Sequence, residues 1–192
     1  AAFIHLLPFL PADYAVRVAF AMLLGLTLVC CWYAIYQLAR QRSAQPVAFA
    51  FGGEASPTDY ARAMADAGLL ALIACLGLAQ MSHEATPDLA RLCAISALML
   101  AGARMAHADD PHPRLTLLLW WVATAGLAMS GAPWIAMASG SGLLLILTVT
   151  RARSGLGNPY NLIWAAVGVA TIVWAVATFE TLPWPTMAFP LE

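Results

Sequence analysis

The chain contains no lysine, and all nine of its basic residues are arginines. Without lysine it cannot form a retinal Schiff base. Only 10% of its residues are charged, whereas about a quarter are charged in ordinary soluble domains. The net charge of -1 gives no concentrated basic surface for counterion release from a nucleic acid. These shortages exclude a nucleic-acid-binding role and make an ordinary soluble domain a poor description of the chain.

Sequence motifs of several enzyme classes are missing as well. There is no G-x-S-x-G elbow, no H-E-x-x-H zinc motif and no Walker loop. Ser139 and Ser141 have no histidine or lysine within the same apolar segment to act as a base. The four cysteines lie inside apolar segments and lack the spacing of a zinc or thioredoxin-like site. We therefore expect the protein not to be an enzyme.

Apolar residues dominate what is present. They make up 62% of the chain and are gathered in runs that approach or reach the length of a bilayer-crossing helix. This pattern predicts an all-α, polytopic integral membrane protein whose residues 1–192 form a single transmembrane helical domain. The segment from Phe3 to Leu10 is too short to cross and is expected to lie at the membrane interface. The six expected spans are about 15–38, 60–81, 88–106, 115–130, 134–150 and 160–179.

Small residues recur at four-residue spacing in these runs, which allows helices to approach closely in lipid. Ala63, Ala67 and Ala71 form such a stripe in the second span, and the third span has a similar one. We therefore expect the second and third spans to form a tight hairpin. The fourth and fifth spans are joined only by 131–133, which requires them to be antiparallel.

The arginines are distributed unequally between the two ends of the expected helices. Arg17 and Arg91 lie at one end, and the other seven flank the opposite end. Because arginines in short loops resist translocation, the end with seven is expected to face the cytoplasm. This places both termini outside, in the periplasm if the membrane is a bacterial inner membrane. The seven are Arg40, Arg42, Arg62, Arg104, Arg114, Arg151 and Arg153.

Asp66 is the acidic side chain placed deepest in an expected span. A carboxylate within the bilayer is costly, and it suggests a proton relay or an ion ligand. Arg62 lies one helical turn earlier and is a suitable ion-pair partner. We favour a structural Arg62–Asp66 pair, with a transport role for Asp66 as the alternative.

The segment from Met105 to His112 is the best candidate metal site. His107, Asp109 and His112 offer imidazole and carboxylate ligands suited to copper or zinc. Their spacing matches no established ligand motif, so a water-exposed turn at the end of a helix is the simpler interpretation. No other cofactor is implied.

Three functional hypotheses follow from these residues. The first is a non-catalytic membrane subunit or scaffold, because stripes of small residues are abundant and embedded chemistry is scarce. Its expected partners are the lipid bilayer and other membrane protein subunits. The second is a small transporter or channel that uses Asp66, and the third is copper or other metal handling at His107 to His112.

Overall fold

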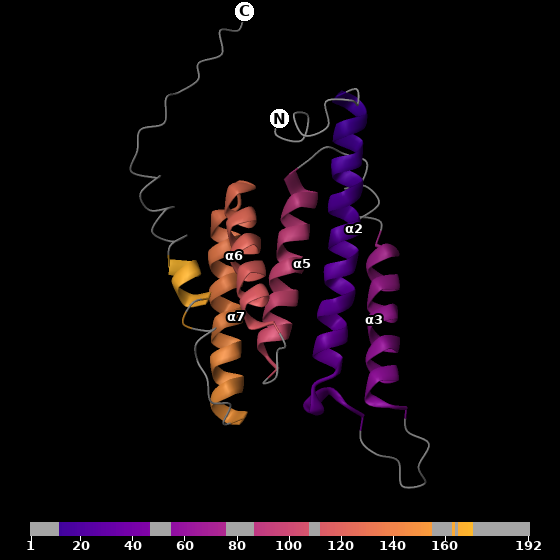
Figure 1. Ribbon diagram of the computed structural model, residues 1–192, viewed down its shortest axis with the longest axis vertical. Helices are drawn as coiled ribbons and strands as arrows, with labels where there is room; N and C mark the ends of the chain where they lie inside the picture. Colours follow the sequence, from indigo (N-terminus) through magenta and orange to yellow (C-terminus); the bar gives the residue numbers. More distant parts are fainter. Residues whose placement is uncertain are drawn as a thin grey trace, which may run out of the picture.

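A computed structural model describes residues 12–46, 55–75, 87–107, 112–154, 163 and 165–170 (Figure 1). Within these residues every regular element is a helix, which confirms the predicted all-α class. The expected interfacial segment and most of the expected sixth span lie outside the described residues. The elements are α2 (Ala12–Ala39), the short 3-10 helix η1 (Arg42–Ala44), α3 (Pro57–Ile73), α5 (Pro87–Met105), α6 (Pro113–Met129) and α7 (Pro133–Ser154).

Proline begins four of these helices, at Pro57, Pro87, Pro113 and Pro133. Proline is suited to the first helical position because its fixed φ matches the helix and its missing N–H would have no partner there. At α3 the preceding Ser56 also caps the helix, and its hydroxyl accepts a hydrogen bond of 3.2 Å from the Asp59 backbone N–H. These local signals determine where the helices start.

The helices stand side by side, with α3 at one edge, α2 next to it, then α5, and α6 and α7 beyond (Figure 1). The expected hairpin between the second and third spans is therefore wrong, because α2 lies between α3 and α5. This order arises because both α3 and α5 present small residues toward α2. α3 packs on α2 through Ala61, Ala65 and Gly68, and the Cys30 side of α2 packs against the α5 alanines.

The centre of the described core lies where α5, α6 and α7 meet. Trp120 of α6 is fully buried there, and its indole N–H has no hydrogen-bond acceptor among the described residues. Gly102 lets α5 approach α7, because a Cβ at this position would lie 2.9 Å from Leu143 Cγ. Close helix approach at small residues thus does occur, although not between the pair of helices that the sequence suggested.

One helix in the described part of the chain is long and apolar enough to cross a membrane. It is the segment Tyr14–Ala39 of α2, with 26 residues and a mean hydropathy of 2.2. The segments Pro113–Met129 and Pro133–Val149 are shorter apolar helices. α5 is less apolar because it contains Asp88, Arg91 and Arg104. Within the described residues, one of the expected spans thus has the length and apolarity of a full crossing.

Neighbouring helices alternate in direction along the chain. α2, α5 and α7 run one way, and α3 and α6 run the other (Figure 1). The chain therefore returns to the same end of the bundle at 40–46, at His107 and His112, and at the end of α7, and all seven arginines of the expected cytoplasmic group belong to that end. We call it the arginine end.

Candidate functional site at the arginine end

Asp66 makes a contact that the sequence analysis did not anticipate. Trp32 of α2 donates a hydrogen bond of 2.8 Å from its indole Nε1 to Asp66 Oδ1 on α3. The expected pair with Arg62 does not form, because Arg62 Nη1 instead lies 3.7 Å from Asp59 Oδ1. Helical side chains tilt toward the helix N-terminus, so Arg62 reaches back to Asp59 rather than forward to Asp66. Asp66 is thus held by a neutral donor from a neighbouring helix.

Trp32 belongs to an aromatic cluster on α2 that also contains Tyr33 and Tyr36. The Trp32 and Tyr36 rings are stacked, with centroids 5.3 Å apart and an interplanar angle of 8°. Tyr33 meets Trp32 edge-on, with centroids 4.9 Å apart. The Arg40 guanidinium carbon lies 5.6 Å from the centre of the Tyr36 ring, a cation–π contact. A continuous series of contacts therefore connects Asp66, Trp32, Tyr36 and Arg40.

The sequence carries a signal for the Trp32–Asp66 contact. α2 and α3 are consecutive, antiparallel neighbours, so residues at similar distances from their connection lie at similar heights in the bundle. Trp32 lies seven residues before the end of α2 at Ala39, and Asp66 lies nine residues after the start of α3 at Pro57. Pairing by height would have identified Trp32, whereas the search for a nearby opposite charge on the same helix identified Arg62.

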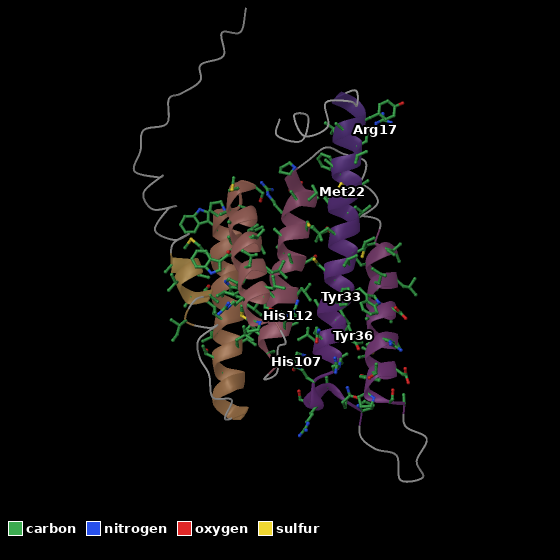
Figure 2. The ribbon with its side chains drawn as sticks, viewed as in Figure 1. Arg17, Met22, Tyr33, Tyr36, His107 and His112 are labelled. Carbon is green, nitrogen blue, oxygen red and sulfur yellow. The ribbon has the colours of Figure 1, made fainter. Side chains whose placement is uncertain are left out.

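Two of the three candidate metal ligands, His107 and His112, lie at the same end of the bundle (Figure 2). His107 Nε2 lies 2.8 Å from the carbonyl oxygen of Gln37, to which a protonated Nε2 donates, and this contact joins the end of α5 to the end of α2. His112 is exposed and immediately precedes α6, while Asp109 lies outside the described residues. In the described ranges no three His, Cys, Asp or Glu side chains form a metal-binding group. The described partner of His107 is thus the Gln37 carbonyl oxygen, a contact between two helix ends.

The opposite end of the bundle contains a second polar cluster, centred on Arg91. Arg91 Nη1 lies 2.8 Å from Asp88 Oδ1, three residues earlier on the same helix. Arg91 Nε and Nη2 also donate to the carbonyl oxygen of Ser130, at 3.2 and 3.0 Å. Gly131 follows with a φ of 81°, a backbone conformation that glycine adopts without strain. Arg91 therefore joins α5 to the turn between α6 and α7, a structural role.

The charged groups Asp66, Arg40 and Arg62 lie on the outside of the bundle, whereas His107 is half-buried between the ends of α5 and α2. Asp66 is an exposed residue at the edge where α3 meets α2, and Arg40 and Arg62 are exposed as well. This arrangement can hold an aromatic cluster in place, present cations and accept further hydrogen bonds at Asp66. No protein-family model, curated protein or solved structure matches the chain, so the interpretation rests on this geometry alone.

Proposed function

We propose that the protein is a non-catalytic integral membrane subunit that packs against partner membrane proteins. Its six spans would lie in a bacterial inner membrane, with the arginine end in the cytoplasm and both termini in the periplasm. The character of α2 supports a lipid environment, because only 17% of its most apolar window is buried within the bundle. The core helix of a water-soluble protein buries most of such a window.

The outer face of α3 is the observation that carries the subunit proposal. This face carries the exposed Ala63, Ala67 and Ala71 beside the exposed Leu70, while Ala61 and Ala65 on the other side are fully buried against α2. α3 thus has small residues on two sides, of which the described part of its own chain covers one. In lipid, small residues in such a register favour close approach by another helix.

Asp66 lies at the border between this outer face and α2, at a height between Ala63 and Ala67. A carboxylate offers about four acceptor positions, and Trp32 fills one of them. Exposure of the remainder to hydrocarbon is costly, so a partner helix with a hydrogen-bond donor at this height would stabilise the assembly. The position of Asp66 outside the described bundle also favours a subunit over a pathway through this chain alone.

Ala67→Phe tests this proposal, with Ala125→Phe as the matched control. Both alanines are exposed on helices, and Ala125 lies on α6, away from the α3 outer face. We expect the wild-type chain and Ala125→Phe to purify from native membranes with the same stoichiometric partner subunit, identified by mass spectrometry. Ala67→Phe should lose that partner while remaining in the membrane. A wild-type chain that purifies as a solitary monomer, or a partner retained by Ala67→Phe, would contradict the proposal.

A further inference from the structure

An exposed stripe runs along α2 toward the arginine end. Leu26, Val29 and Tyr33 have exposed fractions of 51%, 51% and 48%. They are spaced by three and four residues, and the same spacing continues to Tyr36 and Arg40, so all five share one face of the helix. We call this face the α2 stripe. It passes from aliphatic side chains to tyrosines and ends at an arginine.

The length of the α2 stripe matches one leaflet of a bilayer. From Leu26 to Tyr36 a helix advances about 15 Å at 1.5 Å per residue. This distance is half of the roughly 30 Å hydrocarbon core. Arg40 lies one further turn along, at the height of a phospholipid headgroup if the tyrosines mark the interface.

The charges around the stripe favour an anionic headgroup. Asp59 receives a hydrogen bond from Ser56 and lies near Arg62, and Asp66 receives the Trp32 indole N–H. Among the described residues, no carboxylate lies within ion-pair distance of Arg40 or Arg42, and both arginines are exposed. These two cations are therefore uncompensated within the described part of the chain.

The aromatic cluster also positions the Arg40 side chain before any ligand arrives. Asp66 holds Trp32, Trp32 stacks on Tyr36, and Tyr36 contacts the Arg40 guanidinium. A guanidinium group binds phosphate oxygens in a bidentate geometry and, when already restrained, loses less freedom on binding.

We propose that the α2 stripe binds one anionic phospholipid, with its phosphate at Arg40 and Arg42 and one acyl chain along Leu26, Val29 and Tyr33. This inference rests on the membrane location proposed above. Arg40 and Arg42 would then bind one particular lipid molecule. Arginines that only orient a helix in the membrane would show no such preference.

Native mass spectrometry of the purified full chain tests the proposal with equimolar phosphatidylglycerol and phosphatidylcholine as probes. We expect one phosphatidylglycerol to be retained in preference to phosphatidylcholine. Arg40→Gln should weaken this retention about fivefold, the loss expected for one arginine at an anionic lipid surface. Arg40→Lys should lose less, because it keeps the charge. Arg114→Gln is the matched control, since Arg114 is exposed at the same end but lies on α6, and it should bind like wild type.

Other outcomes separate this inference from the membrane proposal on which it rests. If the chain is in the membrane fraction but retains both lipids equally, or if Arg114→Gln weakens retention as much as Arg40→Gln, the lipid site is wrong and the membrane location stands. Displacement of the lipid by inorganic phosphate alone would also overturn the lipid site, because the acyl chain would then contribute nothing. A chain found in the soluble fraction of cells would instead contradict the proposed membrane function.

Discussion

At the scale of single residues, the partner of Asp66 is the uncharged indole N–H of Trp32. Asparagine at position 66 should therefore preserve the contact, whereas alanine should not. Asp66→Asn keeps a side-chain oxygen that can accept the Trp32 N–H, so the contact between α2 and α3 should persist. Asp66→Ala removes the acceptor and should lower the thermal midpoint in detergent by about 2–4 °C. The indole proton resonance of Trp32, assigned by its loss in Trp32→Phe, should move upfield in Asp66→Ala and remain nearly unchanged in Asp66→Asn.

Arg62→Gln serves as the control for the identity of the Asp66 partner. Arg62 lies near Asp59 on the surface, so its replacement should leave the Trp32 resonance and the thermal midpoint close to wild type. If Arg62→Gln instead destabilises the protein as much as Asp66→Ala, then Arg62 is the partner of Asp66 and the indole contact is secondary.

Trp120 gives a second prediction at this scale. Its buried indole N–H has no acceptor among the described residues, so replacing the ring with one that lacks the N–H removes an unsatisfied donor. Trp120→Phe should therefore destabilise the protein by less than about 1 kcal/mol, whereas Trp120→Ala should cost about 3–5 kcal/mol through the cavity it leaves. Chemical unfolding in detergent measures both. Similar losses for the two variants would show that the indole N–H has an acceptor in the native protein.

Which residues could be predicted from the sequence depended on the distance over which they interact. The ion pair of Arg91 with Asp88 could be predicted from their spacing of three residues, because both lie on one turn of a helix. The contacts of Arg91 with Ser130 and of His107 with Gln37 could not, because they join residues 39 and 70 positions apart. Hydrogen bonds to backbone carbonyls leave no trace in residue type, so only the tertiary arrangement reveals them.

At the scale of the helices, Gly102 determines how closely α5 and α7 approach. Gly102→Ala places a methyl group against the Leu143 side chain, including its branch point Cγ at 2.9 Å, so that side chain has to shift. We expect a loss of about 1–3 kcal/mol in unfolding free energy, larger than the gain in helix propensity. Gly142→Ala is the matched control, since nothing lies within 4 Å of a Cβ there, and it should be neutral or stabilising.

A companion variant ties the effect of Gly102→Ala to this contact. Leu143→Ala removes the side chain that the new methyl group meets, so the double variant should lose less stability than the sum of the two single variants. Additive losses would mean that Gly102 is needed for a reason other than the approach of α7.

The starts of the helices were predicted more accurately than their neighbours in space. Proline marks four helix starts in the sequence itself, and the expected starts fell within three residues of Pro57, Pro87, Pro113 and Pro133. The pairing of the second and third spans was wrong because small residues occur on several faces of these helices. A stripe of alanines shows that a helix can be approached closely, but it does not identify the neighbour, and the Ala63, Ala67 and Ala71 stripe is exposed.

At the scale of the whole molecule, the alternating directions of the helices gather seven of the nine arginines at one end of the bundle. The expected spans alone place seven arginines on one side, and the alternating directions of the described helices bring the same seven to one end (Figure 1). This agreement arises because the described helices alternate in direction along the chain, as the expected spans do. The location of the bundle in a bilayer is a further step, since in the described residues one helix meets the length and hydropathy of a full span.

Reporter fusions test the proposed orientation of the whole molecule. If the arginine end is cytoplasmic, green fluorescent protein fused after Ser43 should be fluorescent, and alkaline phosphatase fused there should be inactive. After Ser130, at the other end of the bundle, alkaline phosphatase should be active because it folds in the periplasm. Replacing Arg40, Arg42 and Arg62 with glutamine should reduce the difference in reporter activity between the two positions. These substitutions remove three of the seven arginines that would keep the arginine end in the cytoplasm. Equal reporter activity at both positions would contradict a bundle that spans the membrane, and reversed activity would contradict the assignment of the arginine end to the cytoplasm.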